Sequence, residues 1–339
     1  MNYDIMLDHA MGGIFGQAIG DAFGIPALLR PELTEKQFGW ITSFLEPTPD
    51  HPAHGGMPRA RITDDTEQAL VLAEIFLRDN KVSVEGTVEG ILKWYDMIDG
   101  DNSPYVGPST RKAVLGLKQG KDPYTTGDTG DTNGSAMRIS PVGIMNAGDI
   151  HQACEDAYLT CVPSHHTYSA VSATCAVSGA IAKAMIPGSS LEDIIETGIT
   201  CAEENRWRGM SWFASNVARR IAFGVELASD KNKSVKERLL DIYDFIGGGF
   251  LASEAIPSAF ALFYMAEGDV MLTAELSANM SGDADTIGAI ACAMAGAYSG
   301  FSSIPSSSVA LVEEVNETWK FREIATDLAL YAMKRGSNA

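Results

Sequence analysis

Two short segments of the sequence place pairs of carboxylates beside threonines, at positions where helices are predicted to begin. Residues 62–67 read ITDDTE and residues 281–286 read SGDADT. A capping box, with Asp64 as the cap and Glu67 three residues later, accounts for the first segment without any chemistry. A cap accounts for one acid of the second segment, but not for two acids at i and i+2 behind a glycine. That spacing points two carboxylates to one centre, as in loops that bind hard cations, although the EF-hand pattern is absent.

Together the two segments would place four carboxylates in one site if both helix starts meet in space: those of Asp64, Asp65, Asp283 and Asp285. Four ionised groups at neutral pH are costly unless protons or cations compensate them. Each helix N-terminus supplies only about half of a positive charge. Two divalent cations would neutralise the set, and oxygen ligands from Asp and Thr favour Mg²⁺ or Mn²⁺ over Zn²⁺.

Three further segments have both a functional and an ordinary structural explanation. NGSAMR at 133–138 exposes backbone N–H groups that would attract an anion, but an asparagine cap followed by small residues explains it equally well. Arg138 could reach a phosphate or pair with a buried acid. In SHH at 164–166 either histidine could be a satisfied core residue, and GDAFG at 20–24 could simply end a helix at a C-cap glycine.

The elements that must position these side chains are predicted to be helices along the whole chain. Apolar residues recur at intervals of three and four, and alternation of strand length is almost absent. Two stretches rich in small residues, 169–185 and 286–300, are expected to be central buried helices, because small residues let helix axes approach closely. We predict an all-α fold, a compact single-domain orthogonal bundle of about a dozen helices spanning residues 1–339. The predicted helices lie near 5–22, 65–80, 84–97, 109–119, 134–146, 149–161, 167–186, 190–204, 208–228, 234–246, 254–266, 270–279, 286–299 and 320–334.

Composition excludes several classes of partner and compartment. The 339 residues include 25 basic and 44 acidic side chains, a net charge of −19, which argues against nucleic-acid and anionic-membrane binding. The N-terminal stretch carries Asp4 and Asp8 and lacks the basic residues of a signal peptide. Five cysteines without a CxxC spacing indicate reduced thiols, so a cytoplasmic location is expected. No long amphipathic seam is free for pairing, so a monomer is expected.

Two long loops, 24–62 and 120–133, are candidates for functional or mobile segments. His51 and His54 lie in the first of them, and Pro52 between them excludes a regular helix. With no third ligand nearby in the sequence, we interpret this segment as a mobile loop that could cover the site.

An ordered set of motifs resembles the ADP-ribosylglycohydrolase family, which includes the dinitrogenase-reductase-activating glycohydrolases and the ADP-ribosylarginine hydrolases. The motifs are GQAIGDAFG, TDDT, NGSAMRISPVG, SHHTYSA and GDADTIGAIACAMAGAYSG, and they cover residues from about 9 to about 300. The resemblance implies that the two acidic helix starts meet in a central metal cleft holding two Mg²⁺ or Mn²⁺ ions. It places the metal ligands at Thr63, Asp64, Asp65, Asp283, Asp285 and Thr286, with Asp285 bridging both ions.

The resemblance also implies roles for other residues. Asp64 or Asp65 would take the proton of the attacking water, and Asp283 is the third candidate catalytic acid. The 133–137 segment would hold the phosphates of ADP-ribose, and His165 would line the ligand site. The candidate substrate-binding residues are Asp21, Asn133, Gly134, Ser135, Ala136, Met137, His165 and Gly282.

Three positions depart from the family pattern. Leu28 stands where the family usually has a glutamate beside the metal site, and Glu32 could replace it only if the loop bends. Ala284 stands where threonine is common, and Ser164 stands where threonine usually precedes the histidine. The first departure leaves the usual acid–base arrangement in doubt.

The implied reaction is hydrolysis at C1 of a ribose, through an oxocarbenium-like transition state. The expected substrate resembles ADP-ribosylated arginine. Hydrolysis of a smaller N-riboside by the same ions is the alternative, because the missing glutamate leaves room for another leaving group. A non-catalytic ADP-ribose-binding protein is a third possibility, although all six matched ligand positions are kept. A Mg²⁺-dependent phosphohydrolase ranks lowest, because no nucleophile for phosphate attack stands out.

Overall fold

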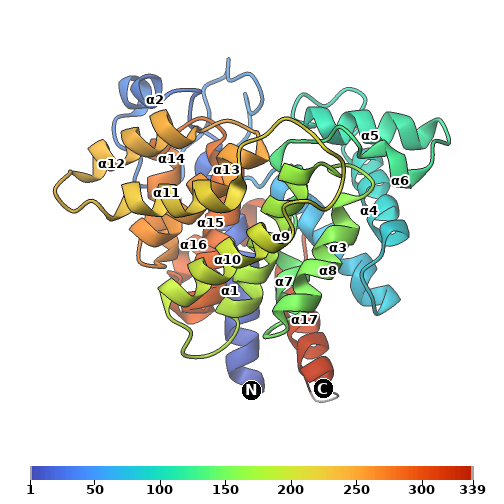
Figure 1. Cartoon of the computed structure of the whole chain (residues 1–339). Helices are drawn as coiled ribbons and strands as arrows, with labels where there is room; N and C mark the ends of the chain where they lie inside the picture. The colour runs from blue at the N-terminus through green and yellow to red at the C-terminus, as the bar shows by residue number, and fades with distance from the viewer. Residues whose placement is uncertain (1, 337–339) are drawn as a thin grey trace.

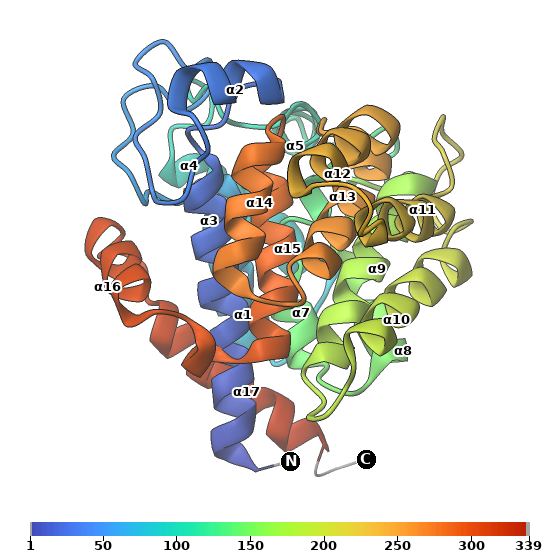
Figure 2. The same cartoon turned by 90° about the vertical axis from the view of Figure 1, so that its left-hand side faces the viewer.

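Two glycine-rich helices, α1 (Tyr3–Gly24) and α15 (Ala284–Ser299), pack along each other at the centre of the fold (Figure 2). Glycines recur every fourth residue on the contact face of α1. A Cβ on Gly12, Gly16, Gly20 or Gly24 would overlap backbone atoms of Gly296, Cys292, Gly288 and Asp285 in turn. The pairing order shows that the helices are antiparallel. The end of α1 therefore lies beside the start of α15, and this close approach positions the site.

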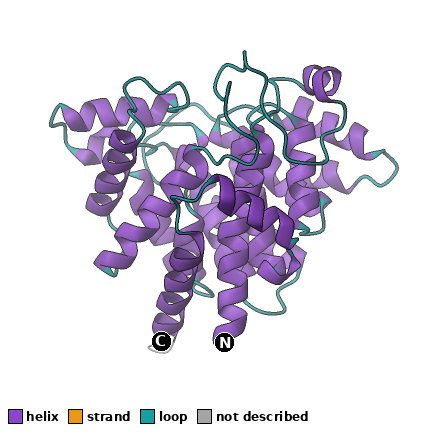
Figure 3. Ribbon diagram, turned by 180° about the vertical axis from the view of Figure 1, so that it is seen from behind, coloured by secondary structure: helices purple, strands orange, loops and turns teal. Residues whose placement is uncertain are grey.

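The computed structural model describes residues 2–336, which form 17 α-helices together with short 3₁₀ and π-helical turns (Figure 3). The remaining helices are α2 (Pro31–Phe38), α3 (Asp64–Asp79), α4 (Val84–Met97), α5 (Pro108–Lys118), α6 (Pro123–Thr126), α7 (Ser140–Met145), α8 (Ile150–Cys161), α9 (Tyr168–Ala184), α10 (Leu191–Glu204), α11 (Val217–Ser229), α12 (Val235–Asp241), α13 (Ala252–Met265), α14 (Val270–Met280), α16 (Ser306–Val315) and α17 (Phe321–Gly336). The turns are η1 (Asn133–Ser135), η2 (Ile242–Ile246) and η3 (Phe301–Ser303).

The other helices surround this central pair. Helices α14 and α17 pack against it, and α9 packs between α8, α10 and α13 (Figure 1). Helix α9 is buried on all sides, and Gly179 lets α10 approach it, since a Cβ there would overlap the sulfur of Cys201. The buried apolar side chains form one continuous cluster. The predicted all-α fold is confirmed. None of the helices in residues 2–336 has the length and hydrophobicity of a membrane span.

Loops and chain ends occupy opposite ends of the molecule. The two described ends of the chain lie side by side at the bottom of Figure 1, whereas the long loops gather at the top. The loop at 39–63 runs over this upper end, where α1 ends and α15 begins. The helix starts that carry the acidic motifs therefore face the loops.

Several predicted elements differ from the structure. The helix predicted at 134–146 is a 3₁₀ turn followed by the short α7, because Pro141 lacks an N–H and begins a new helix. The helix predicted from 208 begins only at Val217. Residues 205–216 form turns, bends and irregular loop, and Gly209 has a positive φ of 96°. The sequence prediction missed α2, α6 and α16, which are short and begin beside or at prolines.

Candidate active site

The end of α1 joins the two acidic segments. Asp21 lies one turn before the end of α1, and its carboxylate accepts hydrogen bonds from the Thr63 amide at 2.9 Å and the Thr66 hydroxyl at 2.6 Å. This carboxylate therefore ties the start of α3 to α1. One turn further along α1, Gly24 lies against the backbone of Asp285. The structure thus brings both helix starts to one place.

The capping box predicted at the start of α3 is wrong. Helix α3 begins at Asp64, and Thr63 is the residue that precedes it. The Thr63 hydroxyl lies 2.9 Å from Asp21 and 3.0 Å from the Asp65 carboxylate. Glu67 does not turn back to the helix start, because it accepts from Arg61 at 2.7 Å and from the Trp94 indole at 3.1 Å. The two aspartates are thus not used as caps.

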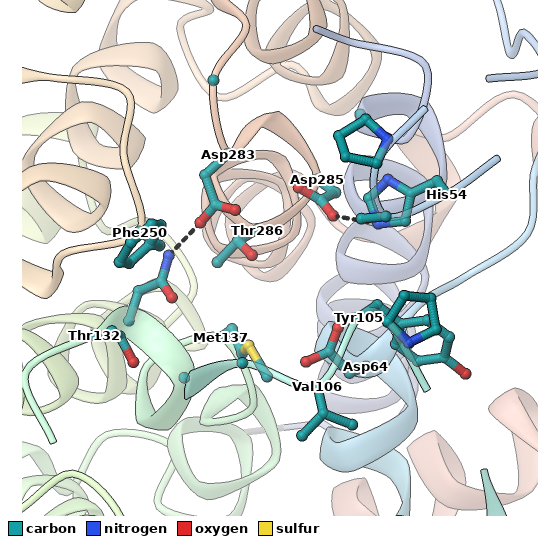
Figure 4. Close-up of a pocket in the computed structure, with 18 of the residues that line it drawn as sticks. His54, Asp64, Tyr105, Val106, Thr132, Met137, Phe250, Asp283, Asp285 and Thr286 are labelled. Atoms are coloured by element: carbon teal, nitrogen blue, oxygen red, sulfur yellow. Dashed lines mark hydrogen bonds and ion pairs between the residues drawn. The ribbon is translucent and has the colours of Figure 1, made fainter. Parts of the chain in front are cut away.

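A cavity of about 270 Å³ opens between these helix starts and the loops above them (Figure 4). Asp64 from α3 lies on one side, and Asp283, Asp285 and Thr286 lie on the other. Of the predicted substrate-binding residues, Asn133, Gly134, Met137 and Gly282 also line it. The cavity is thus polar at the acidic helix starts, while its rim includes Tyr105, Val106 and Phe250.

Asn133 fixes the orientation of Asp283. Its side-chain amide donates to Asp283 Oδ2 at 2.5 Å, and its backbone N–H donates to the carbonyl of Phe250 at 2.9 Å. The Asp283 amide in turn donates to the carbonyl of Gly248 at 2.7 Å. The segment 248–250 therefore holds the asparagine turn and the start of α15 together.

Burial among like charges shifts the pKa values of the carboxylates in the acidic cluster. Burial raises the pKa of Asp283 to about 7, and the neighbouring Asp285 adds to the effect. Burial likewise raises the pKa of Asp21 to about 7. For Asp64 and Asp65, burial and neighbouring carboxylates raise the pKa well above the usual range. The cluster therefore holds protons at neutral pH unless other positive charge compensates it.

One cation from the chain itself reaches the cluster. His54 is only 6% exposed, and its Nε2 lies 3.2 Å from Asp285 Oδ2 (Figure 4). Burial alone would lower the pKa of His54, but the charge of Asp285 and the hydrogen bond between them outweigh it and raise the pKa to about 9. For Asp285, the same contact outweighs burial and keeps the pKa below the usual range. Sequence reasoning placed His54 in a covering loop but missed this contact, since its partner is remote in the sequence.

Several predicted site residues lie behind the cavity rather than on it. His165 is fully buried, with Nε2 3.1 Å from the Thr132 hydroxyl, and a Cβ on Gly134 would contact its ring. Burial lowers the pKa of His165 well below the usual range, so the ring is neutral. Those absent from the cavity wall are Asp21, Thr63, Asp65, Ser135, Ala136 and His165.

Arg138 hydrogen-bonds to neutral side chains and does not pair with a buried acid. It is 1% exposed and donates to the Gln68 amide oxygen and to the Ser164 hydroxyl, each at 2.7 Å. Burial lowers its pKa to about 10, so it stays charged at neutral pH. Leu28 lies beside the site, where its carbonyl accepts from the Gly282 amide at 3.0 Å. Glu32 is exposed on α2 and is absent from the cavity wall.

The donor set fits divalent cations in its chemistry. The candidate ligands are carboxylates and hydroxyls, and Asp65 Oδ1 is buried without a hydrogen-bond partner. Within residues 2–336, however, no three His, Cys, Asp or Glu side chains are already arranged to hold an ion. Asp283 and Asp285 are instead engaged by Asn133 and His54. Suitable donors are thus present at the cavity without a preformed cage.

The fold is that of known helical proteins of one class. A solved structure described as an ADP-ribosylglycohydrolase-related protein complex superposes with a TM-score of 0.69, over 97% of this chain and 99% of that chain, at 22% sequence identity. The chain therefore shares the fold of that helical protein over almost its whole length.

Sequence comparison identifies the family. The model of the ADP-ribosylglycohydrolase family matches residues 2–338, so the chain belongs to this family. YegU of Escherichia coli is 34% identical, over 97% of this chain and 98% of YegU. The ADP-ribosyl-[dinitrogen reductase] glycohydrolase of Rhodospirillum rubrum is 25% identical, over 95% of this chain and 96% of that protein. The ADP-ribosylarginine hydrolase Tri1 of Pseudomonas putida is also 25% identical, over 95% and 78% respectively.

Proposed function

We propose that the protein is a divalent-metal-dependent hydrolase that cleaves the C1 ribosyl bond of an ADP-ribosylated substrate, with ADP-ribosyl-arginine as the model. The observation that carries this proposal is the convergence of Asp64, Asp283 and Asp285, from two helix starts, on one cavity. The names of the Rhodospirillum and Pseudomonas relatives support the substrate class.

Six residues would hold the ions, with two Mg²⁺ or Mn²⁺ per chain as the proposed cofactors. Divalent ions bound there would lower the pKa of the attacking water and help to orient the ribose. The proposed ligands are Thr63, Asp64, Asp65, Asp283, Asp285 and Thr286. Burial raises the pKa values of Asp64, Asp65 and Asp283, and these carboxylates would become ionised when cations compensate them.

Asp64 is the proposed proton acceptor, because it lines the cavity whereas Asp65 faces Thr63. The oxygen of water forms a bond to C1 while the bond from C1 to the leaving nitrogen breaks and its electron pair goes to that nitrogen. Asp64 takes one proton from the water, and the nitrogen takes a proton from solvent. The chain's contribution is chiefly to position these groups, which is worth several kcal/mol in well-aligned reactions.

The turn at 133–137 is the proposed binding segment for the diphosphate. Asn133, Gly134 and Met137 line the cavity beside the acids. Asn133 already orients Asp283, so one turn would connect substrate binding with the acidic cluster.

The test is a panel of ribosides assayed with Mg²⁺, with Mn²⁺ and with EDTA. We expect ADP-ribose release from ADP-ribosyl-arginine, with loss in EDTA and in Asp64→Asn and Asp283→Asn. Ribose release from free nucleosides alone would favour the N-riboside alternative, which the aliphatic Leu28 keeps open. Binding of ADP-ribose without turnover of any riboside would indicate a non-catalytic member of the fold.

A further inference from the structure

The geometry points to His54 as a nitrogen ligand of the divalent centre, which makes the centre a mixed nitrogen–oxygen site that prefers a first-row transition ion such as Mn²⁺ to Mg²⁺. This inference rests on the proposed metal dependence. It adds a ligand from the loop at 39–63, outside the two acidic motifs.

The separation of the two atoms matches that of neighbouring ligands on one ion. His54 Nε2 lies 3.2 Å from Asp285 Oδ2. Two donors at right angles, each about 2.1 Å from an ion, are about 3.0 Å apart. In the absence of an ion a proton joins the same two atoms. An ion bound at Asp285 would therefore have the imidazole nitrogen within its reach.

His51 builds the turn that presents His54. The Nδ1 atom of His51 accepts the backbone N–H groups of Ala53 at 3.3 Å and His54 at 3.0 Å. Since Nδ1 accepts, the proton of the neutral ring is on Nε2, which donates to the carbonyl of Ala27 at 3.0 Å. The turn is thereby fixed to the segment that follows α1, close to Asp285.

The ring of His54 contacts Asp285 through Nε2, whereas its other nitrogen, Nδ1, has no hydrogen-bond partner. It stacks on His51 with ring centroids 4.9 Å apart and an interplanar angle of 14°. Its Nδ1 atom is buried without a hydrogen-bond partner. The second N–H of a ligating imidazole usually donates to a carbonyl or carboxylate, which orients the ring. In this protein, stacking on His51 orients the ring instead. No partner for Nδ1 draws the ring away from Asp285.

A second buried atom independently indicates a missing cation. Asp65 Oδ1 has no hydrogen-bond partner, although Asp65 is only 1% exposed. An orphaned carboxylate oxygen inside a protein is costly and is commonly satisfied by an ion. His54 Nε2 beside Asp285 would add a nitrogen donor to the carboxylates, so the donor set would differ from an all-oxygen Mg²⁺ site. Imidazole donors suit transition ions, whereas Mg²⁺ prefers oxygen and retains water.

The test measures metal binding rather than turnover. Mn²⁺ and Mg²⁺ affinities are measured by titration calorimetry on the full chain, together with the electron spin-echo modulation of bound Mn²⁺. We expect ¹⁴N modulation in the wild type and its replacement by ¹⁵N coupling after labelling with ¹⁵N-histidine. His54→Gln should abolish the nitrogen signal and weaken Mn²⁺ binding by about 10- to 100-fold, with a smaller loss for Mg²⁺. The control His151→Gln changes an exposed histidine outside this cavity and should change neither quantity.

Each other result overturns the inference. Unchanged Mn²⁺ affinity and a persisting nitrogen signal in His54→Gln would show that His54 does not bind the ion. Tighter binding of both ions would make it a counter-charge that the metal displaces. The wild type could bind Mn²⁺ without nitrogen coupling, while Asp65→Asn loses Mn²⁺ binding. That result would show that His54 is not a ligand but would leave the proposed metal site standing. Absence of any Mn²⁺ binding in the wild type would overturn both the nitrogen ligand and the proposed metal dependence. Thermal unfolding in EDTA checks that His54→Gln is folded.

Discussion

Gly24 at the end of α1 lies directly against the backbone of Asp285 at the start of α15, so that any side chain at position 24 would overlap it. The contact is between helix backbones and leaves no flexible group to move aside. The position of a candidate metal ligand is therefore set by a residue without a side chain on another helix.

Gly24→Ala should move the start of α15 away from α1. We expect overpacking to cost about 1–3 kcal/mol in the free energy of unfolding, together with weaker divalent-ion binding because Asp285 shifts. Gly13→Ala is the control on the same helix, since its Cβ would meet chiefly the end of the Ile144 side chain at 3.1 Å. Denaturant unfolding and calorimetry measure the two effects. An equal loss of stability and of ion binding in Gly24→Ala and Gly13→Ala would show that the contact with Asp285 does not position the site.

Asn133→Ala should impair the site without unfolding the protein. The variant removes the 2.5 Å hydrogen bond to Asp283, and a hydrogen bond to a charged group is worth about 1.5–3 kcal/mol. We expect kcat/KM to fall by about 10- to 100-fold. Asn133→Asp should be worse, because it places another carboxylate against Asp283. Steady-state kinetics with ADP-ribosyl-arginine measures both, with the exposed Asn102→Ala as control. Full activity of Asn133→Asp would refute this role.

Local patterns predicted most of the helices because their periodicity is strong, and the exceptions have physical causes. Pro141 interrupts what otherwise resembles one helix over 134–146. At 208–216 the pattern is helical, but Gly209 lies against the backbone of His166 and Met210 pairs with Thr167, so tertiary contacts override it. Helix α16 is short and weakly patterned.

The candidate site was less predictable than the helices. The acidic motifs are local signals, and the resemblance to a family supplied the meeting of the two helix starts. The contact of His54 with Asp285 has no local signal, because the two residues are far apart in the sequence and Pro52 argues against a helical metal pair. The buried location of His165 and Arg138 likewise depends on packing that no motif records.

The stability of the metal-free protein should fall as the pH rises. Folding raises the pKa of Asp21 and Asp283 to about 7 and that of His54 to about 9, so the folded state binds protons more tightly than the unfolded chain. The aspartate contribution is fully present below about pH 4 and is lost as the pH rises through 7. The histidine contribution is present below about pH 6.5 and is lost as the pH rises through 9. The lowered pKa of Asp285 acts only in acid, below this window. The lowered pKa values of His165 and His51 act in the opposite sense, but only below about pH 6.5, so the fall in stability is read between pH 7 and 9.

Denaturant unfolding in EDTA at pH 5, 7 and 9 measures this slope. Asp283→Asn should flatten it, whereas Glu317→Gln, at an exposed position on another part of the surface, should leave it unchanged. Added Mn²⁺ should stabilise the protein more at pH 8 than at pH 5.5, because ions and protons compete for the same carboxylates. A stability that is constant or rises over this range would show that the cluster is compensated in another way.

Arg138 should act on the site through Gln68 rather than by touching a phosphate. Its guanidinium donates to the Gln68 amide oxygen at 2.7 Å, and the Gln68 amide nitrogen lies 3.4 Å from Asp64 Oδ2. Arg138→Met leaves the Gln68 oxygen without this buried donor, which should cost about 1–3 kcal/mol, whereas the Ser164 hydroxyl keeps its contact with His165 Nδ1.

Asp64 would then lose its fixed orientation, so kcat should fall while KM for the ADP-ribosyl substrate stays within about twofold. Gln68→Met should reproduce the loss of kcat, because it removes the side-chain amide that links Arg138 to Asp64. Arg78→Met is the control at an exposed pair with Glu89 and should leave kcat and KM unchanged. A large rise in KM with unchanged kcat in Arg138→Met would instead indicate that this arginine binds the diphosphate.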